Sequence, residues 1–421
     1  MNLATFLKGG IHPAEKKEYT SSIEIKTAKI PKKIVIPLSQ HIGAPCKPLV
    51  EVGARVKVGQ KIGEASGFVS APVHSSVSGK VVEIAAYALP TGRMSDAIVI
   101  ENDNLDEWID HIVDDEYIEK SPEILKARIK EAGIVGMGGA TFPTHVKLSP
   151  PKEKTIDTII INGAECEPYL TSDHRVMVER PDDVIDGLKI LMRILSVSKG
   201  FIGIEENKPD AVKKLRDACR DKSDIEIRTL KVKYPQGAEK MLIKSIVDRD
   251  VPAGGLPMDI GVVVQNAGTA VAIYEACRYG KPLIERVVSV TGKGVAAPGN
   301  YKVRIGTFIS SLVEECGGLK KDAAKIICGG PMMGFAIHSL EVPVIKGTSG
   351  IVVLTEKEVA HSAKFSHCIR CGRCVEACPM GLMPNMLSLL SEKSFYGECK
   401  DYNLFDCFEC GCCTFVCPAK R

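Results

Sequence analysis

The period of the hydrophobic residues changes along this chain and divides it into parts. Between residues 31 and 102, apolar and polar residues alternate in short stretches separated by glycines, a pattern typical of a small β-sandwich or barrel. From about residue 155 to 284, strand-sized apolar stretches take turns with helix-sized amphipathic ones, which predicts βαβ units and a parallel sheet. The strands expected there are 158–161, 201–205, 224–230 and 261–265, and the expected helices are 181–195, 210–219, 237–247 and one that ends at Cys277.

The remaining segments are shorter and less regular. Residues 1–30 are polar and basic, which predicts an extended arm, and Ser121 before Pro122 signals the start of a further helix. Two strand-like stretches and a helix after residue 285 predict a small β-grasp unit, followed from residue 346 by a helical connection. We therefore expect a multidomain α/β fold with an N-terminal arm (1–30), a barrel-sandwich that resembles lipoyl and biotinyl carriers (31–102), a Rossmann-like α/β domain (103–284), a β-grasp unit (285–345) and a C-terminal domain (346–421).

Composition excludes several classes of function. The chain has 421 residues, and 55 Lys and Arg against 52 Asp and Glu give a net charge of +3, too balanced to indicate a nucleic-acid partner. No apolar stretch is long enough to span a membrane, and the first residues lack the basic and apolar regions of a secretory signal. We therefore expect a cytoplasmic protein, in which the 16 cysteines are thiols or metal ligands.

Half of these cysteines form the strongest signal in the sequence. Two copies of the spacing C-x₂-C-x₂-C-x₃-C-P occur near the C-terminus, and the eight cysteines are Cys368, Cys371, Cys374, Cys378, Cys407, Cys410, Cys413 and Cys417. This is the spacing of bacterial two-cluster ferredoxins, in which the fourth cysteine of each motif ligates the cluster of the other. Zinc is the alternative, but zinc sites usually consist of separated cysteine pairs. The sequence predicts two [4Fe–4S] clusters.

The predicted ligands follow from that exchange between motifs. We call the first cluster the one held by Cys368, Cys371, Cys374 and Cys417, and the second cluster the one held by Cys407, Cys410, Cys413 and Cys378. Cys412 lies inside the second motif but off its register, and Cys399 precedes that motif. Either could compete as a ligand, but both are expected to be spectators. The other six cysteines are expected to be buried small side chains, and they are Cys46, Cys166, Cys219, Cys277, Cys316 and Cys328.

A second group of candidates lies in and beside the predicted parallel sheet. The glycines of Gly136–Gly139 leave backbone N–H groups open to a planar or phosphorylated ligand, although such loops also occur as ordinary turns. Asn162, Glu165 and Glu167 follow a strand directly, at the sheet edge where open α/β sheets bind ligands. Asn266 and Thr269 lie where another strand meets a helix, so they could lie near a bound phosphate or simply cap that helix.

Four segments resemble, in their order along the chain, the FMN and NADH site of the flavoprotein subunit of respiratory complex I. They are Gly136–Lys147, Asn162–Pro168, Tyr234–Glu239 and Val264–Thr269. The resemblance implies FMN on the glycine-rich loop with its phosphate near Asn266 and Thr269, and NAD(H) stacked on the flavin beneath Phe142. The residues that it assigns to the two cofactors are Gly136, Gly138, Gly139, Phe142, Lys147, Asn162, Glu165, Glu167, Tyr234, Gly237, Glu239, Gln265, Asn266 and Thr269. Complex I has an arginine where Met137 stands here, and it carries a single cluster on a different cysteine bundle.

No general acid or base is expected, since hydride transfer requires only alignment of the two carriers. None of the histidines is paired with a carboxylate at a catalytic spacing, and Gly329–Gly334 is expected to be an ordinary turn.

The order of the parts along the whole chain resembles the C subunit of the Rnf electron transport complex. The resemblance includes Gly9–Pro13, the carrier-like sandwich, which has no lysine between Lys61 and Lys80 to modify, the flavin domain, a β-grasp (SLBB-like) unit and two clusters. It implies a membrane-bound ferredoxin:NAD⁺ oxidoreductase that translocates Na⁺ or H⁺, with this chain as the peripheral NAD(H)-reactive subunit on the cytoplasmic face. The implied partners are integral-membrane flavoproteins and a ferredoxin-like subunit. A cobalamin reductase of diol-utilising microcompartments and a pure iron–sulfur electron carrier are the alternatives.

Overall fold

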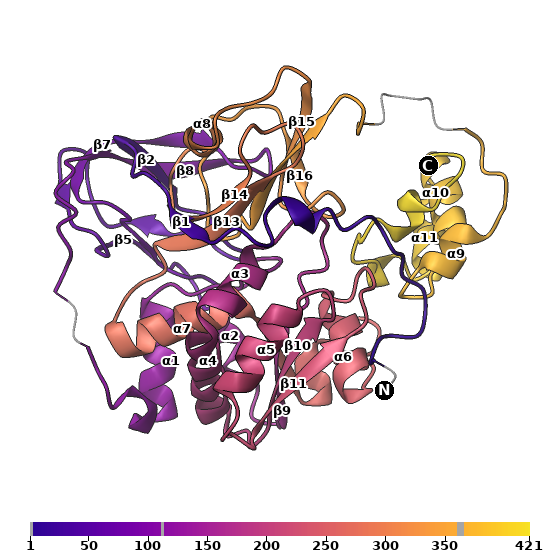
Figure 1. Ribbon diagram of the computed structural model, residues 1–421, viewed down its shortest axis with the longest axis horizontal. Coiled ribbons are helices and arrows are strands. Elements are labelled where there is room, and N and C mark those ends of the chain that lie inside the picture. Colours follow the sequence, from indigo (N-terminus) through magenta and orange to yellow (C-terminus); the bar gives the residue numbers. More distant parts are fainter. Residues whose placement is uncertain (1–2, 111–112, 360–365) are drawn as a thin grey trace.

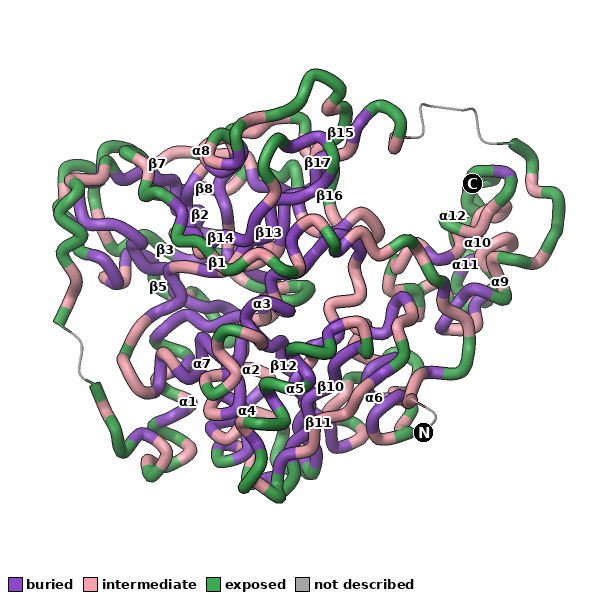
Figure 2. The backbone as a smooth tube through the Cα atoms, in the orientation of Figure 1, coloured by how far each residue is buried: buried purple, intermediate pink, exposed green. Residues whose placement is uncertain are grey.

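The computed structural model describes residues 3–110, 113–359 and 366–421. Its ribbon shows two β-rich units above an α/β unit, with a small group of helices, drawn in yellow, on one side (Figure 1). Buried residues concentrate in the sheets and in the helices packed on them, whereas the C-terminal helices are mostly exposed or half-buried (Figure 2). None of the helices in these described residues is both long and apolar enough to cross a membrane.

The first β-rich unit is the predicted barrel-sandwich. One sheet has the order β2-β8-β7-β4, and the other has the order β3-β5-β6. The strands are β2 (Lys33–Pro37), β3 (Lys47–Pro48), β4 (Arg55–Val56), β5 (Lys61–Glu64), β6 (Val73–His74), β7 (Gly79–Ala88) and β8 (Met94–Asn102). Isoleucines and valines of both sheets fill the space between them, among them Ile34, Ile62, Val73 and Ile98, all fully buried. Alternation of apolar and polar residues therefore predicted this unit correctly.

The α/β unit is built on a four-stranded parallel sheet with the order β11-β10-β9-β12. Its strands are β9 (Thr158–Gly163), β10 (Gly200–Glu205), β11 (Ile225–Leu230) and β12 (Val262–Asn266). Its helices are α1 (Pro122–Glu131), α2 (Thr144–Lys147), α3 (Ser172–Glu179), α4 (Pro181–Leu195), α5 (Pro209–Ala218), α6 (Glu239–Val247) and α7 (Ala267–Tyr279). Within β9, Ile159 and Ile161 face the core that includes α4 and α7, whereas Ile160 faces the core that includes α6. Burial on both faces explains why these strands are continuously apolar.

Local signals fixed the ends of these helices. The Ser121 hydroxyl accepts a hydrogen bond from the backbone N–H of Ile124, and Pro122 is the first residue of α1. Every helix predicted for this region is present, with ends that differ from the expected ones by at most two residues.

The second β-rich unit is a six-stranded sheet with the order β1-β14-β13-β17-β15-β16. Its strands are β1 (Ile25–Thr27), β13 (Glu285–Thr291), β14 (Gly299–Arg304), β15 (Ala323–Cys328), β16 (Phe335–Ile337) and β17 (Gly350–Thr355), and its helix is α8 (Ile309–Glu315). The prediction of a helical connection from residue 346 is wrong, because β17 pairs with β13 and β15 inside this sheet. Residues 25–27 likewise pair with β14. We therefore propose that this unit takes β1 from the arm and extends to Thr355.

The C-terminal helices are short and carry the cysteine motifs. They are α9 (Arg373–Ala377), α10 (Pro384–Glu392), α11 (Tyr396–Asp401) and α12 (Cys412–Phe415). The N-terminal arm, drawn in indigo, runs alongside them before it reaches the β-rich units (Figure 1). The two ends of the chain therefore lie side by side in the fold.

Candidate redox site

The glycine-rich loop rests on the N-terminus of α7. The backbone N–H of Met137 donates to Thr269 Oγ1 over 2.9 Å, and Asn266 Oδ1 accepts from the backbone N–H of Thr269 over 3.2 Å. The side-chain amide of Asn266 also donates to Asp173 Oδ2 over 2.6 Å. Asn266 therefore caps α7, as the capping alternative expected, whereas the hydroxyl of Thr269 anchors the backbone of the loop at Met137 and Val135.

The loop is open on its other side. Gly138, Gly139 and Ala140 are exposed, and a Cβ placed on Gly139 would meet no atom within 4 Å. At the end of β12, directly before Asn266, the buried amide nitrogen of Gln265 has no hydrogen-bond partner among the described residues. An open backbone and an unused donor fit a ligand rich in acceptors, such as a flavin with its phosphate.

Arg286 supplies a positive charge under this loop that the sequence did not reveal. Its guanidinium donates to the backbone carbonyl of Met137 over 3.3 Å and to that of Lys346 over 2.6 Å. Arg286 comes from β13, far along the chain, and burial lowers its pKa to about 10. A cation therefore lies at the residue where the complex I motif has its own arginine.

The two acids after β9 are both engaged by the protein. Glu165 accepts hydrogen bonds from the backbone N–H groups of Asp173 (2.8 Å) and His174 (3.1 Å), so it caps α3. Glu167 accepts from the backbone N–H groups of Met332 (3.1 Å) and Met333 (2.8 Å). Gly329–Gly334 is a turn, as expected, closed by the N–H of Gly334 on the carbonyl of Gly330 over 2.8 Å. The sequence did not reveal that this turn of the six-stranded unit binds Glu167.

Two buried lysines hold the backbone of the same acidic loop. Lys17 Nζ donates to three carbonyls, those of Glu165, Glu167 and Leu170, at 2.9, 2.9 and 2.6 Å. Lys208 Nζ donates to the carbonyl of Ala164 over 2.6 Å and to Glu205 Oε2 over 3.2 Å. Lysines are rarely buried unless their charge is satisfied, so the loop is fixed by three donors of Lys17 and by Lys208. Local sequence patterns do not predict such contacts, because Lys17 and the loop are about 150 residues apart in the chain.

Other predicted residues meet at the carboxyl ends of β9 and β12. Lys147 Nζ donates to Glu239 Oε1 over 2.7 Å and to the carbonyl of Val264 over 3.1 Å. The side-chain amide of Asn162 donates to the carbonyl of Gly237 over 2.8 Å. Phe142, half-buried, closes the glycine-rich loop when its carbonyl accepts from the backbone N–H of Gly136 over 2.9 Å. The structure thus brings together every segment of the predicted site.

Tyr234 is the exception, since it points toward the cysteine motifs. Its hydroxyl donates to the backbone carbonyl of Cys410 over 2.9 Å, and its ring packs in a small core with Ile11, Ala377 and Cys412. Cys166, half-buried, lies against this core too, whereas the other five cysteines of its group are buried as expected. The α/β unit and the C-terminal unit are therefore in direct contact.

One histidine also departs from expectation. His174 Nε2 lies 2.7 Å from Asp210 Oδ1, so the prediction that no histidine is paired with a carboxylate is wrong. The pair joins α3 to α5, because His174 and Asp210 belong to these helices.

The two cysteine motifs have matching local geometry. Backbone N–H groups two residues beyond the first cysteine donate to its sulfur over 3.4 Å, at Cys368 and at Cys407. Backbone N–H groups four residues beyond the fourth cysteine do the same, at 3.4 Å for Cys378 and 3.5 Å for Cys417. Hydrogen bonds to sulfur stabilise thiolates and tune iron–sulfur clusters, so these loops fit such a group.

The structure also supports exchange of ligands between the motifs. Burial raises the pKa of the Cys407 thiol, and the neighbouring sulfurs of Cys410 and Cys378 raise it further. At the other end, the backbone N–H of Ser366 donates to the carbonyl of Ala419 over 2.9 Å, so the start of the first motif meets the end of the second. Among the described residues, no three metal-binding side chains converge as one ion requires. A cubane spreads its four thiolates over separate iron atoms.

Glu167 gives a testable pH dependence. Burial raises its pKa from the usual 4.5 to about 7. In this window the folded protein keeps a proton that the unfolded chain has released, so the free energy of unfolding falls as the pH rises, by at most about 3 kcal/mol. We expect Glu167→Gln, which mimics the protonated acid, to remove this part of the slope in urea unfolding at several pH values. The exposed Glu153→Gln is the control, and an equal slope in the wild type and Glu167→Gln would contradict the assignment.

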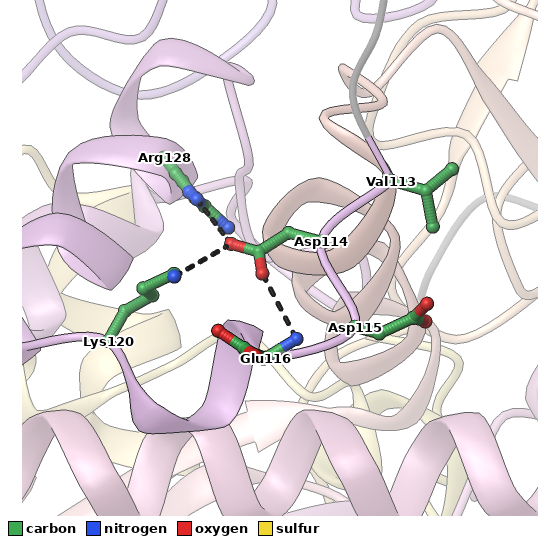
Figure 3. Close-up of a pocket in the computed structure, with 6 residues that line it drawn as sticks. All are labelled: Val113, Asp114, Asp115, Glu116, Lys120 and Arg128. Carbon is green, nitrogen blue, oxygen red and sulfur yellow. Dashed lines mark hydrogen bonds and ion pairs between the residues drawn. The ribbon is translucent and has the colours of Figure 1, made fainter.

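A separate cavity lies elsewhere and takes no part in this site. It has a volume of about 500 Å³ and is lined by Val113, Asp114, Asp115, Glu116, Lys120 and Arg128 (Figure 3). Asp114 is already paired with Arg128 (2.7 Å) and Lys120 (3.7 Å). None of the six is a predicted site residue.

Models of known protein families match four parts of the chain. They are the RnfC barrel sandwich hybrid domain (residues 5–105), the Nuo51 FMN-binding domain (129–275), the SLBB domain (287–336) and the 4Fe-4S dicluster domain (367–420). The predicted fold class is confirmed, and so are FMN and two [4Fe–4S] clusters as cofactors. The assignment of individual residues to these cofactors stays a prediction.

Relatives and solved structures agree with these matches. The chain is 51% identical to the C subunit of a proton-translocating ferredoxin:NAD(+) oxidoreductase complex from Clostridium ljungdahlii, over 98% of this chain and 91% of the relative. It is 46% identical to the Na(+)-translocating counterpart from Acetobacterium woodii, over 98% of this chain and 94% of that protein. An NAD+-reducing [NiFe]-hydrogenase is similar in fold alone, with 20% identity, a TM-score of 0.50, and coverage of 57% of this chain and 48% of its own. The chain belongs to the RnfC family, the C subunits of the ion-translocating ferredoxin:NAD(+) oxidoreductase complexes known as Rnf complexes.

Proposed function

We propose that this protein is the NAD(H)-reactive subunit of an Rnf complex and carries electrons between NAD(H) and its two iron–sulfur clusters. NAD(H) exchanges two electrons as a hydride, whereas an iron–sulfur cluster exchanges one electron. Bound FMN would join the two, because a flavin can do both. The residues proposed to hold it are those of the glycine-rich loop, with Arg286 and Gln265 beneath. The observation that carries the proposal is the contact between this α/β unit and the loop of Cys410, made by Tyr234.

The order of the clusters follows from the same contact. In the second cluster, Cys410 packs against the core formed by Tyr234 and Ile11, and Cys378 directly follows Ala377, a member of that core. Cys371 of the first cluster and Cys407 of the second are both exposed, but none of the four cysteines of the first cluster packs in or against that core. We propose that the second cluster exchanges electrons with the flavin site and the first with a partner protein.

The complex supplies the partners and the place. Both relatives are named as subunits of ion-translocating complexes. We propose that other subunits, integral-membrane flavoproteins and a ferredoxin-like protein, bind this chain at the cytoplasmic face of the membrane.

A nucleotide titration tests this function. The full chain, reconstituted with iron, sulfide and FMN, is mixed without oxygen with NADH, and the flavin absorbance is followed. We expect NADH to bleach the flavin and NAD⁺ to restore it after reduction is complete. A flavin that binds but does not respond to NADH would leave a pure electron carrier as the better description. With cobalamin as the only acceptor, we expect no faster oxidation of NADH than without it.

A further inference from the structure

The N-terminal arm is first anchored along the α/β unit. The backbone N–H of Lys231 donates to the carbonyl of Ala4 over 3.0 Å, just beyond the end of β11. Phe6 is 1% exposed, and Lys233 Nζ lies 4.2 Å from the centre of its ring while donating to its carbonyl over 3.0 Å. A buried aromatic ring of this size contributes strongly to docking, so this part of the arm has a fixed seat.

The next residues of the arm pair with both units at once. Ile11 and Tyr234 exchange two backbone hydrogen bonds, of 2.8 and 2.9 Å, in an antiparallel bridge. The adjacent Gly10 donates its backbone N–H to the carbonyl of Ala377 over 2.9 Å, directly before Cys378. Two consecutive residues of the arm therefore join the α/β unit to a loop of the second cluster.

Gly9 brings the arm into contact with a predicted ligand loop. Its φ is +64°, and a Cβ at this position would lie 2.5 Å from both the carbonyl carbon and the oxygen of Cys378 and 2.6 Å from the nitrogen of Pro379. These are backbone atoms, which cannot turn aside as a flexible side chain can. Only glycine fits here without displacing either the arm or the Cys378 loop.

Tyr234 completes the attachment from the other motif. Its hydroxyl binds the carbonyl of Cys410, while its backbone binds Ile11. Cys378 and Cys410 come from different motifs but belong to the same predicted cluster. A further contact between the units, the N–H of Gly254 to Asp406 over 3.3 Å, is on the exposed surface and is expected to contribute little.

We propose that Gly9, Gly10, Ile11 and Tyr234 are positioning residues that fix the second-cluster loops against the α/β unit. In the sequence, the C-terminal unit follows the six-stranded sheet. The arm is therefore a second attachment, which joins the C-terminal unit to the α/β unit. The inference rests on the proposed function, because the spacing matters only if electrons cross this contact. Electron transfer slows roughly exponentially as the two centres move apart, so loosening of this contact should slow the transfer.

Two variants test the attachment. Gly9→Val pushes the arm off the Cys378 loop, and Tyr234→Phe removes only the hydroxyl bound to Cys410. Gly92→Val is the matched control, because Gly92 has a φ of +80° and no atom within 4 Å of its added Cβ. Leu7→Ala, at a residue of the same arm that is 87% exposed, controls for a change of sequence in the arm.

The first readout needs no cofactor activity. We expect hydrogen exchange at the backbone amides of Gly10 and Ile11 to rise by about tenfold or more in Gly9→Val, since their hydrogen bonds to Ala377 and Tyr234 are loosened. Both control variants should exchange as the wild type does. Unchanged exchange in Gly9→Val would overturn the proposal that this contact holds the arm.

The second readout follows electrons after mixing with NADH. We expect bleaching of the flavin at the wild-type rate in Gly9→Val, and slower reduction of the clusters than in the wild type in both variants. Cluster reduction at the wild-type rate in both would overturn the inference and leave the proposed function standing. Failure of NADH to reduce the flavin in the wild type would instead overturn the proposed function. If Gly9→Val does not assemble the second cluster, Tyr234→Phe decides, because it removes a single hydroxyl.

Discussion

Replacing Cys378 by serine is expected to remove the second cluster and to leave the first, although Cys378 belongs to the first motif. One reason is that Cys378 is near enough to Cys407 to raise the pKa of the Cys407 thiol. The other is that Gly10 binds the carbonyl of Ala377, directly before Cys378, while Tyr234 binds the carbonyl of Cys410 in the second motif. A serine hydroxyl is a far weaker ligand for iron than a thiolate. We expect the iron and sulfide content to fall by about half, and one of two EPR signals of the reduced protein to disappear.

Three further variants define this result. Cys417→Ser should remove the first cluster instead, since Cys417 is its predicted fourth ligand. Cys399→Ser and Cys412→Ser should keep all iron, because these cysteines are predicted spectators, 1% and 0% exposed. A Cys378→Ser protein that loses the first cluster and keeps the second would show that each motif ligates its own cluster.

Replacing Gly139 by valine is expected to weaken FMN binding strongly without destabilising the protein. A Cβ added at Gly139 meets no protein atom within 4 Å, so we expect the folded chain itself to accept the side chain. It would fill the space above the glycine-rich loop where the flavin is proposed to lie. Because the flavin could then no longer approach the loop backbone closely, the affinity for FMN should fall by about a hundredfold or more, or roughly 3 kcal/mol. Fluorescence titration with FMN measures the affinity, and thermal unfolding without FMN measures the stability.

The control for this variant is Gly397→Val. Gly397 also has no neighbour within 4 Å of an added Cβ, and it lies on α11, away from the loop. It should bind FMN as the wild type does. By contrast, Gly138→Val should destabilise the protein as well, because its Cβ would lie 2.6 Å from the side-chain nitrogen of Asn266. Wild-type affinity for FMN in Gly139→Val would exclude this loop as the flavin site.

Local patterns predicted the elements well. The parallel sheet followed from apolar stretches that are buried on both faces, and helix α1 followed from Ser121 and Pro122, whose effects do not depend on distant residues. The cysteine spacing likewise fixes its chemistry within a few residues. Strand β17 was missed because a short apolar stretch near the cysteine motifs carries no sign of its partners, β13 and β15.

The site was predictable in its segments but not in its contacts. The glycine-rich loop and the strand ends were found from their own residues. Arg286, Lys17 and Lys208 were missed, because each reaches the site from a distant part of the chain. Tyr234 was assigned to the two cofactors from its motif, and the contact of its hydroxyl with the carbonyl of Cys410 was not foreseen. Such contacts depend on tertiary packing, which local pattern does not encode.

The most direct test of the central claim is low-temperature EPR of the whole chain after addition of NADH. Protein with both clusters is prepared with and without FMN, frozen after mixing and compared with protein reduced by dithionite. If electrons pass from nucleotide to clusters through the flavin site, NADH will produce the signals of reduced clusters only when FMN is bound. Clusters that stay oxidised with FMN present, or that NADH reduces equally without FMN, would contradict the account.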